Sequence, residues 1–485
     1  MNRKLIIRIL GAILCIEAIA MLPALFISFY YRDGDSTAIG FSLIASAVFG
    51  CSMLFFVKTE KNVHLRLKEG FIVVALGWIL LSFFGALPFF ISGILPRFED
   101  AFFEAVSGFT TTGASVVTDF EHFPRGVMFW RASTHWVGGM GVLVLTLALL
   151  PKLTGRSAHL VKAESPGPSL SKLVPKTGAT AKILYTIYGA LTAAEFIALI
   201  LLGLSPYDAA IHSMATAGTG GFSNYGASIA AFNSIPIEMT IAFFMFLFGI
   251  NFALYYKFII GDHFKAFYKD EEFRWYFFIA ISAILAVSLT NLSHYHGDFL
   301  TSLRYSTFTI CSTMSTTGFV TLDYSVWPVA SHMIIILIMF VGSCAGSTAG
   351  GIKVIRINMI AKLSRRNIRA TGQPKKMEVI RIDGKAVEES ILSQVAQFAL
   401  MYVALWLIGS LIMSFDGQYD LLTHLSASLT CISNVGPGLG AVGPAYNFAG
   451  YGIVAKLTGT VLMLFGRLEL LPMFILFTRS AWKKY

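Results

Sequence analysis

Four short clusters of small and polar residues recur along this 485-residue chain, each inside a stretch of apolar sequence. We call them knots 1 to 4, and they read FTTTGAS (109–115), AGTGGFSN (217–224), MSTTGFVT (314–321) and ISNVGPGLG (432–440). The knots align on one glycine each, which recurs about every hundred residues, at Gly113, Gly221, Gly318 and Gly436. Self-similarity at a fixed period predicts that the chain repeats one structural unit four times.

Each knot follows a semi-apolar segment that is too short to cross a bilayer and too apolar for an ordinary loop. The four segments are 101–110, 208–217, 299–314 and 420–432. A spanning helix needs about 20 residues, so we expect half-length helices that enter the membrane, stop midway and return as extended backbone. Asp100 and Asp208 stand where they would cap the first two of these helices. A small residue stands six positions before each knot glycine, namely Ser107, Ala215, Ser312 and Thr430.

The composition places the chain in a membrane. Hydrophobic residues make up 55% of it and charged residues only 13%, whereas an ordinary globular protein has about 25% charged residues. Apolar runs long enough to span recur along the whole length. The first run continues to Tyr31, beyond the length of a cleavable signal, so we expect an uncleaved first span. The five cysteines show no CxxC spacing, which favours reduced structural thiols.

The net charge of +10 has an explanation that involves no nucleic acid. Of the 37 Lys and Arg residues, 30 fall in the six segments that we expect on one side of the membrane: the N-terminus, 58–68, 152–182, 257–274, 353–385 and 479–485. Positive charge collects on the cytoplasmic side of membrane proteins, so both termini are expected there. The opposite side is rich in carboxylates, which would attract cations or simply cover the surface.

The physical chemistry of the knots indicates an ion path. Non-helical backbone is tolerated in a membrane only where protein buries it or where it lines a water-filled cavity. Four knots around a pseudo-fourfold axis would present rings of carbonyl oxygens that can replace the hydration shell of an ion. Glycine suits such a turn because a Cβ disfavours the backbone angles that it requires. The alternative is that the small residues serve only as helix-packing surfaces.

Several motifs together resemble the Trk/Ktr/HKT superfamily of potassium transporters, and within it the bacterial TrkH-type transporters. They are FFEAVSGFTTTGAS (102–115), GGFS (220–223), TTGF (316–319), GSCAGSTAGGIKVIR (342–356), NVGPGLG (434–440) and LFGRLE (464–469). The resemblance covers essentially all of the chain.

The resemblance implies an all-α polytopic membrane protein with four M1–pore helix–M2 repeats around a pseudo-fourfold pore and two extra N-terminal helices. The expected boundaries are 1–68 for the two N-terminal helices, 69–152 for repeat 1, 181–260 for repeat 2, 272–362 for repeat 3 and 386–485 for repeat 4. In total we expect ten transmembrane helices and four re-entrant ones.

The resemblance also implies potassium uptake across the bacterial inner membrane. It implies a homodimer with one pore per protomer, which works with a cytosolic TrkA-like ring of nucleotide-binding regulatory subunits. No cofactor bound by this chain is expected, and K⁺ is the transported ion. The selectivity filter that the resemblance implies consists of Thr111, Thr112, Gly113, Gly220, Gly221, Thr317, Gly318, Val435 and Gly436. Only the central glycine is common to the four knots, so passage of Rb⁺ and some Na⁺ is expected, while glycine at position 113 goes with K⁺ preference in the superfamily.

Arg467 lies in the apolar run TVLMLFGRLELLPMFILF, where a charge costs at least about 3 kcal/mol and marks a functional site by default. Free carbonyls of an unwound segment are its natural partners, and 342–351 (GSCAGSTAGG) is such a segment, because four glycines in ten residues make a poor helix. We expect 342–351 to interrupt the second span of repeat 3, and we expect no such interruption in the other three repeats. The hypothesis is a gate on the cytoplasmic side of the knots, formed by Gly342, Gly346, Gly350, Gly351 and Arg467. The alternative is static pairing of Arg467 with Glu469 or Glu195.

Other functions find less support. No HExxH, GxSxG or paired intramembrane aspartate indicates an enzyme. The stretch GSTAGGIK misses a phosphate-binding loop because Ile352 separates the glycine from Lys353. Na⁺- or H⁺-coupled symport, or a less selective monovalent cation channel, stays open as an alternative. Glu104 is expected to serve either as a structural group or as a cation attractor. His294 and His296 are expected to face solvent, and His135 and His212 to lie in the core.

Overall fold

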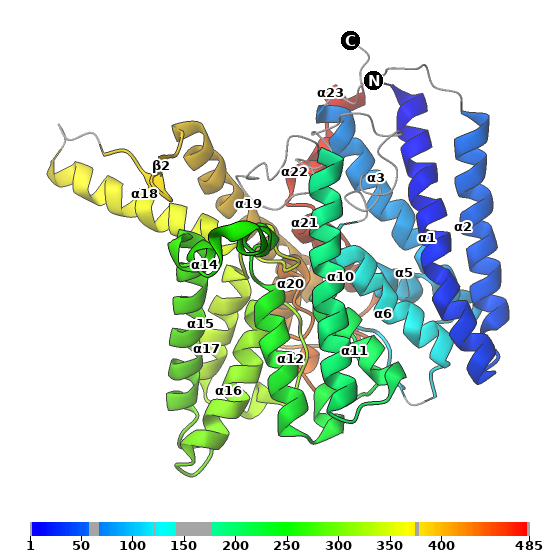
Figure 1. The fold of residues 1–485 in the computed structure, drawn as a ribbon, viewed down its shortest axis with the longest axis horizontal. Coiled ribbons are helices and arrows are strands. Elements are labelled where there is room, and N and C mark those ends of the chain that lie inside the picture. The colour runs from blue at the N-terminus through cyan, green and yellow to red at the C-terminus, as the bar shows by residue number, and fades with distance from the viewer. Residues whose placement is uncertain (1, 58–66, 121, 142–176, 374–377, 483–485) are drawn as a thin grey trace.

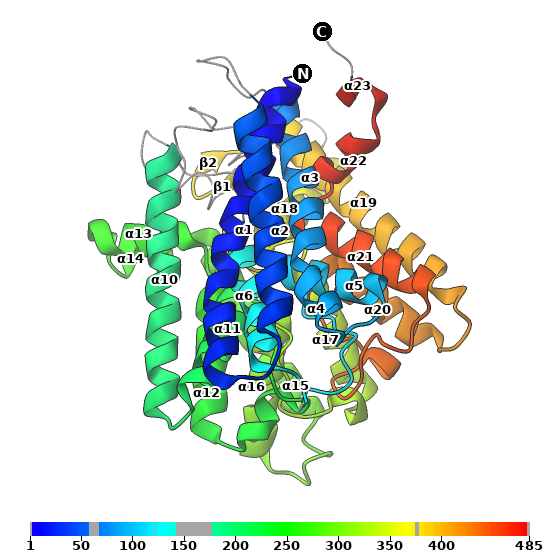
Figure 2. The same ribbon diagram turned by 90° about the vertical axis from the view of Figure 1, so that its right-hand side faces the viewer.

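The computed structural model describes residues 2–57, 67–120, 122–141, 177–373 and 378–482, and these residues form a bundle that is almost entirely helical (Figure 1). The first described helix, α1 (Arg3–Tyr31), begins at the end of the bundle where the last one, α23 (Arg479–Trp482), lies (Figure 2). Within the described ranges, the β-structure is one short antiparallel hairpin of β1 (Arg381–Ile382) and β2 (Lys385–Ala386). The predicted all-α membrane fold is therefore confirmed.

Two long helices, α1 (Arg3–Tyr31) and α2 (Ser36–Phe56), form an antiparallel hairpin at one side of the bundle. The two helices approach closely at Gly11 and Gly50, because glycine has no Cβ. A Cβ at Gly11 would lie only 2.8 Å from the carbonyl oxygen of Gly50, and such close packing through small residues is typical of membrane helices. The hairpin is tied to the rest of the molecule by Asp35, whose carboxylate accepts the backbone N–H of Val127 at 2.8 Å.

Four repeats follow, each with a first span, a short pore helix and a second span. The first spans are α3 (Leu67–Gly85), α10 (Thr177–Leu201), α15 (Glu271–Thr290) and α19 (Glu389–Ser414). The pore helices are α5 (Phe98–Phe109), α11 (Pro206–Gly218), α16 (Phe299–Met314) and α20 (Leu421–Ser433), and they have 12 to 16 residues. The second spans begin with α6 (Arg125–Gly139), α12 (Ile235–Phe248), α17 (Val329–Val341) and α21 (Ile453–Arg467).

The remaining helices continue or connect these units. They are α4 (Leu87–Ile91), α13 (Phe252–Lys257), α14 (Lys265–Lys269), α18 (Val354–Gly372), α22 (Leu471–Phe477) and α23 (Arg479–Trp482). In the described part of the chain, six helices are long and apolar enough to cross a membrane, or eight if each bent pair counts as one span. The ten expected spans include α6 and α17, which have only 15 and 13 residues.

Broken second spans are not confined to repeat 3, and our expectation of a single break is wrong. In repeat 2, α12 and α13 meet at 89° across the segment 249–251. In repeat 4, α21 and α22 meet at 120°, because Glu469 and Leu470 adopt positive φ angles of 55° and 66°. These bends carry no glycine-rich signature comparable to 342–351, which explains why the sequence pattern did not reveal them.

Both expected helix caps are wrong: the N-cap of α5 is Arg97. The N-cap of α11 is Ser205, whose hydroxyl accepts the N–H of Asp208 at 3.1 Å. Asp100 lies in the first turn of α5 and binds the ammonium group of Lys456 at 2.6 Å. The aspartates that do cap pore helices are Asp298 and Asp420, which accept N–H groups in the first turns of α16 and α20.

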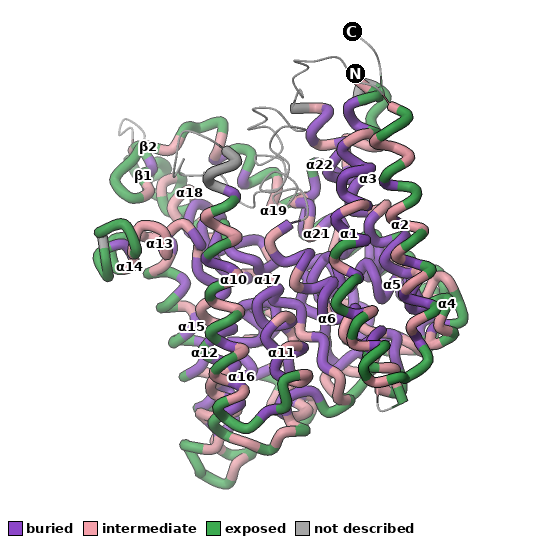
Figure 3. Tube along the Cα trace, turned by 45° about the vertical axis from the view of Figure 1, so that its right-hand side comes forward, coloured by how far each residue is buried: buried purple, intermediate pink, exposed green. Residues whose placement is uncertain are grey.

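Burial follows the architecture. Figure 3 shows buried residues concentrated in the interior, while α2 and α10 expose much of their surface. In α2, α10 and α19, the most apolar window is only 22% buried although its mean hydropathy is 1.8 to 2.0. Apolar side chains that no protein covers fit a hydrocarbon environment. The pore helices lie inside this apolar belt with most of their side chains buried.

Candidate functional site

All four pore helices end in the same Schellman motif. In this motif, two backbone N–H groups after the helix donate back to carbonyls of the last turn, across a residue in the left-handed region. In knot 1, Thr111 N–H donates to Gly108 O at 3.0 Å and Thr112 N–H donates to Ser107 O at 2.8 Å. The second of these bonds repeats with acceptors Ala215, Ser312 and Thr430, at 2.9, 2.9 and 3.0 Å. The small residues singled out in the sequence are therefore the acceptors that terminate the helices.

The left-handed position of this motif is usually glycine, but here it never is. It is occupied by Thr111, Thr219, Thr316 and Asn434, with φ between 54° and 55°. Two residues later, each knot glycine also has positive φ, between 73° and 97°. Two residues with positive φ, separated by one residue, turn the chain sharply out of the helix into extended backbone. Sequence analysis found the glycines but missed the left-handed residues before them.

The knots contact each other in a closed ring. A Cβ added at Gly113 would overlap the carbonyl oxygen of Gly220, and a Cβ at Gly221 would overlap that of Thr317. A Cβ at Gly318 would overlap the carbonyl oxygen of Val435, and one at Gly436 would lie 2.7 Å from that of Thr112. Each glycine thus faces the residue that precedes the glycine of the next knot. The fourth contact returns to knot 1, so the order is cyclic.

A second ring of hydrogen bonds runs from a residue that follows each knot to a backbone carbonyl of the next knot. Arg131 donates to Ser223 O at 3.1 Å between repeats 1 and 2, and Ile229 N–H donates to Val320 O at 3.1 Å between repeats 2 and 3. The Tyr324 hydroxyl donates to Gly438 O at 3.2 Å between repeats 3 and 4. Phe448 N–H donates to Ser115 O at 2.8 Å and closes the ring. The extended segments therefore brace one another around the same axis.

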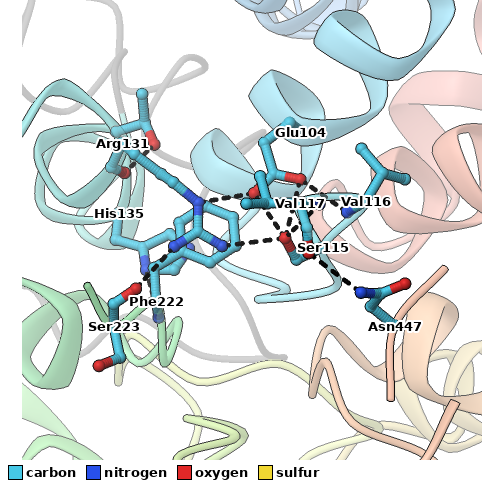
Figure 4. A network of polar contacts seen from close by, with 10 residues as sticks. Glu104, Ser115, Val116, Val117, Arg131, His135, Phe222, Ser223 and Asn447 are labelled. Carbon is cyan, nitrogen blue, oxygen red and sulfur yellow. Dashed lines mark hydrogen bonds and ion pairs between the residues drawn. The ribbon is translucent and has the colours of Figure 1, made fainter. Parts of the chain in front are cut away.

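A buried ion pair supports knots 1 and 2 from behind (Figure 4). Glu104 is 0% exposed, and its carboxylate accepts Arg131 Nε at 2.6 Å and Val116 N–H at 2.9 Å. The Arg131 guanidinium also binds Ser115 Oγ and lies 3.4 Å above the ring of Phe222. These contacts favour the structural interpretation of Glu104. Arg131 is 2% exposed, whereas Arg467 is only partly buried, and the sequence pattern gave no reason to single Arg131 out.

The two histidines expected in the core, His135 and His212, are fully buried, and both lie next to knot 2. The His135 ring stacks on Phe222 with centroids 4.0 Å apart. It also fills the space in which a Cβ at Gly220 would stand. His212 shares a 3.0 Å hydrogen bond with Ser223 Oγ. His294 and His296 are exposed, and among the described residues no group of three or more His, Cys, Asp or Glu could hold a metal ion.

The predicted unwound segment is an Ω-shaped loop with a closed neck, which we call the intramembrane loop (342–353). Ile352, Lys353 and Val354 donate backbone N–H groups at 3.0 Å to Phe340, Val341 and Ser343. The loop packs against the knots, because Gly350 N–H donates to Thr316 Oγ1 at 2.7 Å and Gly351 N–H donates to Ser433 O at 3.0 Å.

Glycine is required at several points of this loop. A Cβ at Gly350 would overlap Ser433 O, and one at Gly342 would lie 2.5 Å from Gly350 O across the neck. Gly342, Gly346 and Gly351 have φ of 67°, 72° and 74°. The loop also fits the bend of repeat 2, where Cys344 N–H donates to Gly249 O at 3.1 Å and Phe252 N–H donates to Gly346 O at 3.1 Å.

Arg467 joins the loop to two further repeats. It is the last residue of α21 and lies at the break of the repeat 4 span. Its guanidinium donates to the carbonyl of Thr348 at 2.6 Å and to those of Gly138 and Gly139 at the end of α6. The expected partners, free carbonyls of the loop, are thus present.

The charged groups around Arg467 have partners of their own. Glu469 accepts hydrogen bonds from Arg356 on α18. Lys353 is 2% exposed, and its ammonium group donates to Ala349 O inside the loop. The lysine of GSTAGGIK, the stretch that resembles a phosphate-binding loop, is thus bound to a carbonyl of the intramembrane loop. Two cations, Arg467 and Lys353, therefore bind the adjacent carbonyls of Thr348 and Ala349.

The family model for TrkH, described as a cation transport protein, matches residues 36–484. The Trk system potassium uptake proteins TrkH of Salmonella typhimurium and of Escherichia coli are each 35% identical over 490 residues, which cover 100% of this chain and of theirs. Escherichia coli TrkG is 32% identical over 486 residues and covers 99% of both chains.

A solved structure agrees with these relatives. The crystal structure of the potassium transporter TrkH from Vibrio parahaemolyticus superposes with a TM-score of 0.89 at 32% identity, over 100% of both chains. That structure and the sequence relatives match this chain over its full length, which includes the two N-terminal helices and the four repeats described above. On these grounds the chain belongs to the TrkH family of cation transport proteins, a family of membrane transporters and not of enzymes.

Proposed function

We propose that the chain takes up potassium ions across the bacterial inner membrane, through a filter formed by the four knots. The observation that carries this proposal is the cyclic contact of the knots, in which each glycine meets the carbonyl oxygen of the next knot. The relatives named as potassium uptake proteins favour K⁺ as the ion. The filter residues are those expected from the sequence: Thr111, Thr112, Gly113, Gly220, Gly221, Thr317, Gly318, Val435 and Gly436.

Two physical features make this ring suitable for a cation. Carbonyl oxygens of Thr112, Gly220, Thr317 and Val435 can replace the hydration shell of the ion, as in other carbonyl-lined filters. The four pore helices also end at the knots, and a helix C-terminus carries a partial negative charge of about half an electron. Four such ends stabilise a monovalent cation without an ionised side chain at the ring.

The intramembrane loop and Arg467 form the gate in this proposal. Gly342, Gly346, Gly350 and Gly351 shape the loop, and Arg467 holds it closed through the Thr348 carbonyl. The support is that knots 3 and 4, the repeat 2 bend and the end of α6 all contact the loop or its arginine. In this proposal the loop, which contacts repeats 2 and 4 directly and repeat 1 through Arg467, obstructs passage, and its displacement opens the path.

The assembly that we propose is a homodimer with one pore per protomer, controlled by a cytosolic TrkA-like ring of nucleotide-binding subunits. Both termini are proposed to be cytoplasmic, and the start of α1 and the helix α23 lie at one end of the bundle (Figure 2). The basic helix α18 projects sideways from the half of the bundle that also holds the start of α1 and α23 (Figure 1), which agrees with the positive-inside rule. Nucleotide binding belongs to the partner in this proposal.

Ion flux in liposomes tests the proposed function. The purified protein is reconstituted, and uptake of K⁺, Rb⁺ and Na⁺ is recorded with and without a proton gradient. We expect K⁺ and Rb⁺ uptake that exceeds Na⁺ uptake and that needs no proton gradient. Equal Na⁺ and K⁺ uptake contradicts the K⁺ assignment, and a strict requirement for the gradient supports the coupled symporter instead.

A further inference from the structure

The buried carboxylate of Glu272 binds one residue of the intramembrane loop and one residue just beyond it. Glu272 is the second residue of α15 and is 6% exposed. Its Oε1 accepts the backbone N–H of Ala345, near the start of the loop, at 2.6 Å. The same oxygen accepts the N–H of Ile355, just beyond the neck, at 3.2 Å. One side chain of α15 therefore fixes how the loop sits against that helix.

The same stretch of loop is held by apolar packing. Ala345 belongs to a small cluster of buried side chains that is separate from the main core of the bundle. Its other buried members come from α18, from the segment before β1 and from α19; they are Ile355, Met359, Ile380, Leu392 and Val395. Ile380, which immediately precedes β1, thus belongs to the same apolar cluster as the loop residue Ala345.

The β1–β2 hairpin is bonded to the helix end that carries Glu272. At its turn, Asp383 Oδ1 accepts the N–H of Glu271 at 2.8 Å, and Asp383 N–H donates to Glu271 Oε2 at 3.4 Å. The ammonium group of Lys362 on α18 binds Glu271 and also the Arg381 carbonyl at 2.7 Å. In Figure 1 this hairpin projects beside α18 at the edge of the bundle.

We infer that Glu272 is a positioning residue for the gate, and that it links the β1–β2 hairpin mechanically to the intramembrane loop. A force that displaces the hairpin moves the N-terminus of α15 and withdraws the carboxylate from Ala345. This inference rests on the proposed gating role of the loop. It adds the route by which a displacement of the β1–β2 hairpin at the surface is transmitted to the intramembrane loop.

Regulator-free Rb⁺ flux of Glu272→Ala in liposomes is the first test. The substitution leaves the Ala345 N–H without its acceptor, and we expect flux to rise by about tenfold, because an unpaired buried donor destabilises the closed loop. Arg467→Ala is measured beside it as a second way to release the loop. If Arg467→Ala raises flux while Glu272→Ala stays at the wild-type level, the inference is overturned.

Glu238→Ala is the matched control. Glu238 is 3% exposed and binds Arg304 at 2.6 Å, so it is also a buried carboxylate that joins two helices, α12 and α16. It has no part in the contacts of the loop described above. We expect its regulator-free flux to stay at the wild-type level. A rise equal to that of Glu272→Ala would mean that general loosening opens the path, and would overturn the inference.

Hydrogen exchange of the loop amides separates this inference from the proposed gate, because it requires no transport. We expect faster exchange in 343–356 for Glu272→Ala, and a smaller increase for Asp383→Ala, which removes only the side-chain acceptor of the Glu271 N–H at the hairpin turn. Glu238→Ala should leave this segment unchanged. Unchanged exchange in Glu272→Ala overturns the role of Glu272, and unchanged exchange in Asp383→Ala overturns the link to the hairpin. If neither Arg467→Ala nor Glu272→Ala alters flux, the gate is wrong and the exchange data alone decide the link.

Discussion

The α-carbon of Gly113 faces the carbonyl oxygen of Gly220 so closely that no side-chain carbon fits between them. The same relationship recurs from knot 2 to knot 3 and from knot 3 to knot 4, and in a looser form from knot 4 to knot 1. Glycine is therefore required twice at each position, once by its positive φ and once by the neighbouring backbone. This double requirement makes the knot glycines the most sensitive test of the ring.

Alanine at the knot glycines should abolish or strongly reduce K⁺ flux, and to different degrees. At Gly113, Gly221 and Gly318 the new Cβ overlaps backbone, so at least tenfold loss of Rb⁺ uptake is expected in liposomes. At Gly436 the Cβ would lie 2.7 Å from Thr112 O, and this variant should retain the most activity. Equal loss at all four positions would show that contact with the next knot does not govern the effect.

Gly297→Ala is the control for that series. Gly297 has φ of 87°, but nothing lies within 4 Å of a Cβ placed there. It shares the backbone strain of the knot glycines, which costs about 1 kcal/mol, without the steric overlap. Wild-type flux is expected for this variant.

Release of the gate should raise flux without the regulator. Arg467→Ala removes the guanidinium that binds Thr348 O and the two carbonyls at the end of α6. Shortening 342–351 removes the obstruction itself. Both variants are expected to raise regulator-free Rb⁺ uptake at least several-fold over the wild type. Flux that remains at the closed-state level in both would contradict the gate and favour static packing of Arg467.

Glu104 and Arg131 should be strongly coupled in stability. Removal of one partner of a buried ion pair leaves an uncompensated charge and costs about 3–5 kcal/mol, whereas removal of both costs less than the sum. We compare the loss of thermal stability of the detergent-solubilised protein in Glu104→Gln, in Arg131→Met and in the double variant. The two single losses should add up to more than the loss in the double variant. Strictly additive losses would show that the two side chains act independently behind the knots.

Glu17 offers a test of the symport alternative. It lies on α1, is 1% exposed, and its carboxyl oxygens have no hydrogen-bond partner among the described residues. An ionised carboxylate is too costly in such a site, so we expect the neutral acid. Glu17→Gln matches that form in shape and charge, and flux should stay at the wild-type level with or without a pH gradient. Loss of a gradient-driven flux in Glu17→Gln would instead identify this carboxyl as a proton carrier.

The sequence was sufficient for the features that depend on local patterns. The four knot glycines, the short pore helices and the unwound segment under Arg467 all follow from spacing and composition. The left-handed Thr111 and Asn434 could not be predicted, because a β-branched or amide residue takes that conformation only when the helix end and the neighbouring knot impose it. The bends of repeats 2 and 4 were missed for a similar reason.

Tertiary contacts account for the other omissions. Glu272 is one of three consecutive acidic residues at a helix start, where carboxylates are common in any case. Its contacts with Ala345 and Ile355 distinguish it from Glu271. Arg131 likewise reads as an ordinary charged residue until Glu104, twenty-seven positions earlier, is placed beside it.

A structure of the protein in Rb⁺, with the ion located by its anomalous scattering, tests the filter most directly. We expect a peak on the axis of the four knots, within coordination distance of the carbonyl oxygens of Thr112, Gly220, Thr317 and Val435. Replacement of Rb⁺ by Na⁺ in the same crystals should remove the ordered ion. A ring without a peak, or an ordered Rb⁺ at another place in the bundle, would contradict a potassium filter formed by these four carbonyls.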